Sequence, residues 1–156
     1  MVIIEDTRQK ASKHKAKHDF FHESSVPLIR CALPFGDYAA APVKVVDTKQ
    51  DVHEMALNLC GSSAEKTRTR NECVKARDAG CKLIFLIEDP HFSDISDLYG
   101  NPISVHNGMT ISGDQLATAM HVMSQRYGCE FRFCKPEDAG RIIMELLDER
   151  QLDKTT

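Results

Sequence analysis

Short apolar runs that end in acidic residues constrain the possible folds of this chain more than any other feature of its sequence. Three such runs occur, at 2–4 before Glu5-Asp6, at 43–46 before Asp47, and at 82–87 before Glu88-Asp89. Their length and their β-branched composition are typical of buried strands. Each run would therefore deliver carboxylates to the C-terminal end of a strand.

The segments between these runs have helical patterns. We expect helices at 8–22, 52–59, 67–79, 112–128 and from 136 onward, and further strands at 26–32, 38–41 and 129–134. Residues 89–111 show little periodicity and are predicted to form a long loop. Strands that alternate with helices predict an α/β fold with a mixed central sheet. We expect residues 1–147 to form one domain and residues 148–156 to form a flexible C-terminal tail.

The overall charge excludes a uniformly cationic nucleic-acid binder. The chain has 156 residues, with 20 basic and 23 acidic side chains and a net charge of −3. A protein with its positive charge on one face remains compatible with these numbers. The longest strongly apolar run, 83–87, is too short to cross a bilayer, and the six cysteines contain no C-x-x-C pair. These features predict a cytoplasmic protein with no membrane partner.

The most informative segment for chemistry combines Asp37 with Asp47 and Lys49. On a strand, Asp47 and Lys49 point to the same side, and Asp37 lies across a plausible strand–turn–strand. Paired carboxylates suit Mg²⁺ or Mn²⁺, and a nearby ammonium can stabilise a developing anion. Spacing alone favours a simpler interpretation, a tight turn at Asp37 and an exposed charge pair on an edge strand, because D-x-K is a common triplet.

The wider pattern resembles the XPF-type structure-specific nuclease domain, a branch of the restriction-endonuclease-like PD-(D/E)xK superfamily. That family begins with a strand ending V-D-S-R-E, and Ile4-Glu5-Asp6-Thr7-Arg8-Gln9 is similar to it. Its hallmark is G-D-Y followed by E-R-K, and Gly36-Asp37-Tyr38 and Asp47-Thr48-Lys49 stand in those places. The resemblance extends from about residue 2 to 147 and implies a three-layer α/β/α fold. The D-T-K form is similar to short stand-alone domains of phage and prophage proteins.

The resemblance implies a divalent-metal-dependent DNA endonuclease that cleaves branched or flapped DNA. It implies Mg²⁺ or Mn²⁺ held by Asp37 and Asp47, with Lys49 as the catalytic cation. Asp6 would be a supporting carboxylate and Arg8 a phosphate contact. It also implies a homodimer built partly from residues 112–147.

Three departures from the family pattern favour an alternative function. Asp47 replaces the usual glutamate, Thr48 replaces arginine, and His53 holds the place of the final aspartate. The alternative is a catalytically degenerate DNA-binding or scaffolding domain of the same fold.

Basic residues suggest where DNA would bind. Residues 8–17 carry five bases and no acid, and a helix there would place Lys10, Lys13 and Lys17 on one face. Such a face could bind phosphates, because backbone neutralisation needs clustered cations, or it could simply be solvated. Arg70 is a further candidate DNA contact, although a surface salt-bridge ladder explains it as well.

Overall fold

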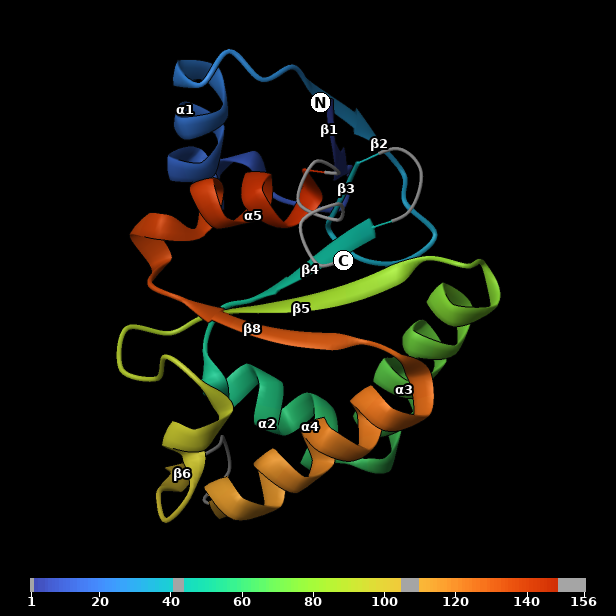
Figure 1. Cartoon of the computed structure of the whole chain (residues 1–156), viewed down its shortest axis with the longest axis vertical. Helices are drawn as coiled ribbons and strands as arrows, with labels where there is room; N and C mark the ends of the chain where they lie inside the picture. The colour runs from blue at the N-terminus through green and yellow to red at the C-terminus, as the bar shows by residue number, and fades with distance from the viewer. Residues whose placement is uncertain (1, 41–43, 105–109, 149–156) are drawn as a thin grey trace, which may run out of the picture.

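A computed structural model describes residues 2–40, 44–104 and 110–148 of the chain (Figure 1). Its strands are β1 (Ile3–Asp6), β2 (Leu28–Cys31), β3 (Tyr38–Ala40), β4 (Lys44–Lys49), β5 (Lys82–Glu88), β6 (Pro102–Ser104), β7 (Thr110–Ser112) and β8 (Glu130–Cys134). Its α-helices are α1 (Lys15–Glu23), α2 (Val52–Cys60), α3 (Ser63–Asp78), α4 (Gly113–Tyr127) and α5 (Ala139–Leu147). Most of the predicted tail, residues 149–156, lies outside the described residues.

A six-stranded mixed sheet forms the middle of the fold, in the order β2-β1-β3-β4-β5-β8. Strand β3 runs antiparallel to both β1 and β4, and the remaining neighbours are parallel. The carboxyl ends of β1, β4 and β5 therefore meet at one edge of the sheet, together with the start of β3. The acidic ends of the three apolar runs thus lie along one edge.

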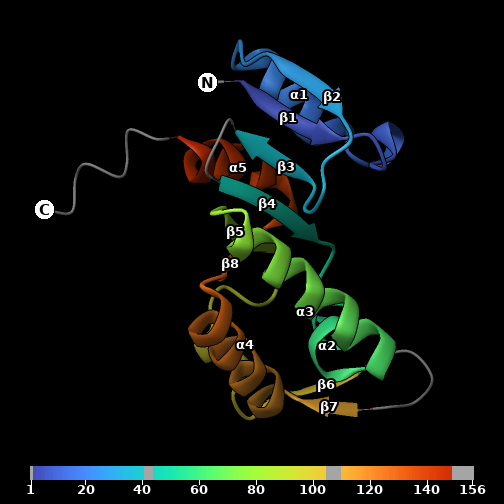
Figure 2. The same cartoon turned by 90° about the vertical axis from the view of Figure 1, so that its right-hand side faces the viewer.

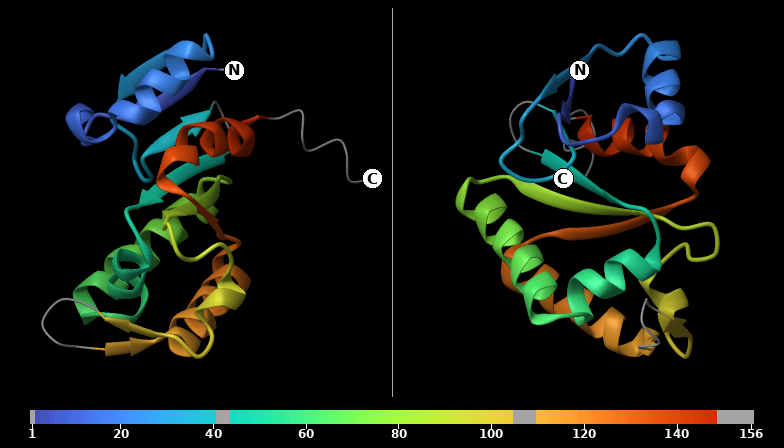
Figure 3. Two further views of the ribbon diagram at one scale, coloured as in Figure 1. Left: turned by 90° about the vertical axis from the view of Figure 1, so that its left-hand side faces the viewer. Right: turned by 180° about the vertical axis from the view of Figure 1, so that it is seen from behind.

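Helices cover both faces of the sheet, which confirms the predicted three-layer α/β/α fold. Helices α1 and α5 lie on one face and α2, α3 and α4 on the other (Figures 1 and 3). Phe21, Ile143 and Leu147 bury the first face against the sheet. Met55 and Leu116 belong to the larger core on the second face. Burial of such side chains contributes roughly 1.5–3 kcal/mol each, so both layers hold the sheet edge in place.

The first helix is shorter than the sequence predicts. Instead of one helix from 8 to 22, the chain forms a turn, a short 3-10 helix at Ala11–Lys13, and then α1 from Lys15. Lys10 therefore does not share a helix face with Lys13 and Lys17, and that part of the prediction is wrong. The physical reason lies at Arg8, whose backbone N–H and guanidinium both bind the Asp6 carboxylate and hold the chain in a turn.

Two other segments differ from the predicted elements. Helix α3 begins at Ser63 rather than near residue 67, because Ser62 and Glu65 form a reciprocal capping box. The predicted loop 89–111 contains a short 3-10 helix at Ile95–Leu98 and, with Thr110–Ser112, the paired strands β6 and β7. Figure 2 shows this small hairpin beside α2 and α4, away from β1. None of the described helices has the length and apolar character needed to cross a membrane.

Candidate active site

Asp37, Asp47 and Lys49 meet where β3 and β4 pair at the sheet edge. Strand β3 begins at Tyr38, which pairs with Val46, and Asp37 directly precedes it, with its N–H donating to the Val46 carbonyl at 2.9 Å. The Asp37 and Asp47 side chains interact with each other. Lys49 lies two residues after Asp47 on β4 and shares its face, and its Nζ lies 3.1 Å from Asp47 Oδ2. The structure thus brings the three predicted residues together.

The Asp37 carboxylate is held by donors from two segments. Thr48 donates to Asp37 Oδ2 with its backbone N–H at 2.7 Å and with its hydroxyl at 2.9 Å. The Gln9 side-chain amide donates to the other oxygen, Oδ1. The carboxylate therefore has a fixed orientation before any ligand arrives.

A close turn at Gly36 delivers Asp37 to this position. Gly36 has φ +72°, and a Cβ placed on it would lie 2.1 Å from Cγ1 of Val45. Only glycine fits both the left-handed backbone and this close approach to the core. The Gly36 N–H donates to Glu72 Oε1 at 2.8 Å, which ties the turn to α3.

Glu72 is a site residue that sequence reasoning missed. It projects from α3 into the carboxylate cluster beside Asp47. Thr69 and Ala76, three residues before and four after it, are buried, so Glu72 lies on the inner face of the helix. The sequence alone does not single it out, because this face of the helix is not marked by an apolar stripe.

Lys49 lies in a mostly buried environment with a second carboxylate nearby. Glu54 Oε1 is 4.0 Å from Lys49 Nζ, and the ammonium lies 5.5 Å from the centre of the Phe85 ring. His53 is exposed and does not line the pocket, so Glu54 rather than His53 supplies the carboxylate after Lys49.

Burial perturbs the proton affinities of the carboxyl groups. The pKa of Asp47 is raised to about 7, chiefly by desolvation; Lys49 lowers it and Asp37 raises it within that net value. Desolvation also raises the pKa of Asp37 and of Glu72. For Lys49, desolvation lowers the pKa, but Asp47 and Glu54 outweigh it and leave a net increase. Burial therefore shifts these carboxyl groups toward their protonated forms, and a bound cation would oppose that shift.

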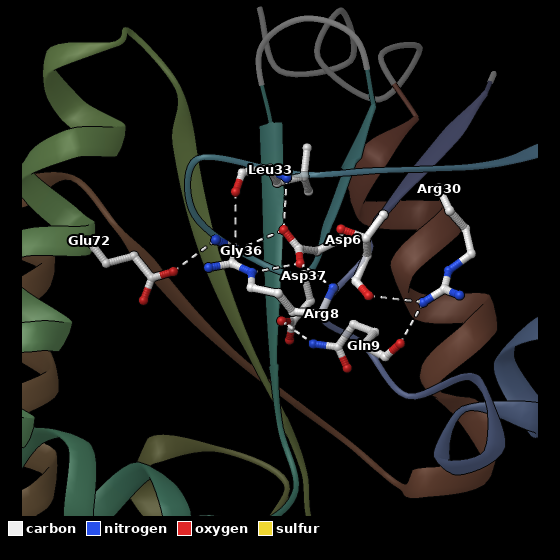
Figure 4. A network of polar contacts seen from close by, with 9 residues as sticks. Asp6, Arg8, Gln9, Arg30, Leu33, Gly36, Asp37 and Glu72 are labelled. Carbon is white, nitrogen blue, oxygen red and sulfur yellow. Dashed lines mark hydrogen bonds and ion pairs between the residues drawn. The ribbon is translucent and has the colours of Figure 1, made fainter.

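The Asp6 carboxylate binds Arg8 and Leu33 (Figure 4), while the Asp6 backbone N–H donates to the Asp37 carbonyl at 2.8 Å. The buried carboxylate of Asp6 accepts hydrogen bonds from the backbone N–H groups of Arg8 and Leu33, at 2.7 and 2.8 Å, and from the Arg8 guanidinium. Hydrogen bonding to Arg8 holds the pKa of Asp6 below its ordinary value, against desolvation. Asp6 is thus fully engaged in holding Arg8 and the neighbouring loop.

A pocket of about 900 Å³ opens above the cluster. Its lining includes the predicted residues Arg8, Lys13, Lys17, Asp37, Asp47 and Lys49. Lys17 is buried there, with its Nζ 2.7 Å from Glu88 Oε1, so its charge is neutralised within the protein. Lys10, Asp6 and Arg70 do not line this pocket, and Arg70 lines a smaller one instead.

The donor set suits a hard divalent cation. Asp37 and Asp47 offer carboxylate oxygens, and Mg²⁺ usually takes only one or two protein carboxylates and keeps several waters. Across residues 2–40, 44–104 and 110–148, no three or more His, Cys, Asp or Glu side chains form a group that could hold a metal ion. The fit is therefore to a water-rich ion on two carboxylates rather than to a closed protein cage.

Comparison with known proteins supports the fold. No protein-family model matches the sequence, and no curated protein does. A solved structure of XPF from Aeropyrum pernix matches with a TM-score of 0.66 and 16% identity, over 100% of this chain and 63% of that one. The chain has the fold of XPF.

A second structure, XPF from Aeropyrum pernix in complex with DNA, is similar to the same degree. Its TM-score is 0.67, with 16% identity over 99% of this chain and 66% of that chain. The chain thus spans just under two thirds of both XPF chains.

Proposed function

We propose that this chain is a divalent-metal-dependent DNA endonuclease. The observation that carries the proposal is the convergence of Asp37 and Asp47 beside Lys49 in a large pocket whose lining also contains Arg8 and Lys13. Raised carboxyl pKa values at this point are typical of a site that is arranged for a cation.

Asp37 and Asp47 would hold Mg²⁺ or Mn²⁺, which when bound would activate a water molecule and polarise the scissile phosphate. Lys49 keeps its proton and stabilises the negative charge that develops on the phosphate oxygens. Thr48 and Gln9 keep Asp37 oriented, so little reorganisation is needed during the reaction. Asp6 supports the site through Arg8 rather than as a ligand.

DNA would enter over the basic lining of the pocket. Arg8 and Lys13 are the proposed phosphate contacts within it, while Lys10 and Arg70 would reach DNA only outside it. The buried Lys17 adds to the site through its ion pair with Glu88. The preference for branched or flapped DNA comes from the family resemblance, and the DNA complex of a structural neighbour supports DNA as the ligand.

The decisive experiment is a cleavage assay on labelled flap, fork and linear duplex DNA, with Mg²⁺, with Mn²⁺ and with a chelator. We expect metal-dependent cleavage that is lost in Asp37→Asn and Lys49→Met. Matched controls are Asp78→Asn at the exposed end of α3 and Lys82→Met at the far end of β5. Cleavage that persists in a chelator, or in both site variants, would refute the proposal.

The degenerate DNA-binding domain remains a second candidate. The absence of a group of three metal-binding side chains among the described residues favours it, as does the exposed His53 in place of an acidic residue. This candidate predicts DNA binding without cleavage of any substrate under the same metal conditions.

The resemblance also leads us to propose a homodimer that involves residues 112–147. Within this region the described residues include one exposed large apolar side chain, Val122 on α4, which is 37% exposed. Light scattering after size exclusion should give the mass of a dimer, and Val122→Asp should shift it toward the 17.5 kDa monomer. A wild-type monomer at all concentrations would contradict this.

A further inference from the structure

One face of α3 forms a line of polar side chains along the pocket. Four residues spaced three or four apart lie on this face and line the pocket: Arg68, Asn71, Glu72 and Lys75. Arg70, two residues after Arg68, projects about 200° around the helix. It lines the smaller cavity of about 400 Å³ between α3 and α4.

The two cationic residues of this face are exposed and free to contact a ligand. Arg68, Asn71 and Lys75 are exposed, whereas Glu72 turns inward and accepts the Gly36 N–H. Within the described part of the chain, neither Arg68 nor Lys75 has a side-chain ion pair within 4.0 Å. Arg77, one turn after Cys73, shows the contrast, because its guanidinium is 2.9 Å from Asp78. The two cations stand beside an acidic cluster without being neutralised by it.

A second basic edge comes from a distant part of the chain. Arg8 and Lys13 line the same pocket from the segment between β1 and α1. Figure 4 shows that α3 and the segment after β1 both contact the turn at Gly36 and Asp37. Glu72 extends from α3 to Gly36, and Gln9 contacts Asp37. Positive charge on two separate segments, around a floor of carboxylates, is complementary to an extended polyanion that passes across the pocket.

We propose that Arg68, Asn71 and Lys75 of α3 form a phosphate-binding rim that contacts the DNA backbone across the pocket from Arg8 and Lys13. Arg68 and Lys75 neutralise phosphates, and the Asn71 amide donates to a phosphate oxygen, as neutral side chains commonly do in DNA complexes. Contacts of this kind position the strand over Asp37 and Asp47 and carry no sequence preference. The assignment rests on the proposed function for its ligand.

The test is DNA binding by fluorescence anisotropy in a chelator, where no cleavage occurs. The double variant Arg68→Gln/Lys75→Gln should weaken binding about tenfold. It should also lower the slope of log K against log salt by roughly 2, since each lost phosphate contact removes about 0.9. The matched control is Arg126→Gln/Lys66→Gln, which removes the same two charge types at the smaller cavity between α3 and α4. It should stay within about twofold of the wild type.

Three results would overturn the rim. These are wild-type affinity and slope in the Arg68/Lys75 variant, equal weakening in both double variants, and no DNA binding by the wild type at low salt. Circular dichroism melts of each variant show whether the fold is kept. If the double variant does not fold, the single exposed change Arg68→Gln gives the same comparison against Arg126→Gln.

The outcome separates this inference from the proposed function. Cleavage that depends on Asp37, with no effect of Arg68 and Lys75 on binding, refutes the rim alone. Binding that depends on Arg68 and Lys75, without cleavage under any metal condition, supports the rim and refutes the nuclease.

Discussion

Thr48 donates two hydrogen bonds to a single oxygen of Asp37, one from its backbone and one from its hydroxyl. Thr48 stands where the XPF-type pattern has an arginine, so a short hydroxyl donor occupies the place of a cationic side chain. The replacement removes a positive charge from the site but fixes the orientation of the carboxylate.

Thr48→Val should reduce single-turnover cleavage about tenfold while leaving the fold intact. The valine keeps the shape and the backbone bond but loses the hydroxyl bond to a charged acceptor, which contributes roughly 1.5–3 kcal/mol. Thr118→Val is a matched control, because that hydroxyl binds only the Asp114 carbonyl on the exposed side of α4. Equal losses in the two variants would rule out a specific role for Thr48.

The pH dependence of stability should report the buried Asp47. Its pKa is about 7 in the folded, metal-free protein, against an ordinary value of 3.8. Between these values the folded state holds a proton that the unfolded state has lost. The free energy of unfolding should therefore fall as pH rises through this window, and level off above about pH 7.

Urea denaturation of the wild type and of Asp47→Asn at pH 5 and pH 8 measures this effect. We expect the stability of the wild type relative to the variant to drop by on the order of 1–4 kcal/mol from the lower to the higher pH. A relative stability that rises with pH would contradict the assignment.

Added Mg²⁺ should oppose the loss of stability at higher pH. A cation on Asp37 and Asp47 needs both carboxylates ionised, so its binding is stronger at pH 8 than at pH 6. Millimolar Mg²⁺ should raise Tm by several degrees at pH 8 and less at pH 6, in line with mass action on the folded state. Thermal melts of Asp37→Asn should show no such shift, and an equal shift in that variant would place the ion elsewhere.

Asp6→Asn should destabilise the protein by roughly 1.5–3 kcal/mol at pH 7, because the buried carboxylate accepts hydrogen bonds from Arg8 and from the Leu33 N–H that a neutral amide cannot match. The pKa of Asp6 is lowered in the folded state, so its contribution is present above pH 3.8 and is lost as pH falls further. Denaturation curves at pH 7 and pH 3 test this. The exposed capping residue Asp94 provides the control variant Asp94→Asn, for which we expect little change.

The strands of the central sheet could be predicted from the sequence, because strands buried between two helical layers must consist largely of apolar residues. Strands β1, β4 and β5 coincide with the apolar runs, and their acidic ends meet at one edge as parallel strands require. The pairing of Asp37 with Asp47 followed from the strand–turn–strand pattern. The resemblance added the roles, and those remain proposals.

Other parts of the site depend on contacts between distant segments and could not be predicted. The inward position of Glu72 is set by its bond to Gly36, 36 residues away in sequence. The ion pair of Lys17 with Glu88 likewise joins α1 to β5. The late start of α1, at Lys15 rather than at Arg8, follows from the contact of Arg8 with Asp6, which the charge pattern does not indicate.

Gly36 links the site to the core through the side chain of Val45. Any β-carbon at position 36 would overlap that valine, and a smaller residue at 45 would make room only by leaving a void in the packed core. The two positions therefore constrain each other during evolution. Reshaping the turn that presents Asp37 would therefore require changes in the core at the same time.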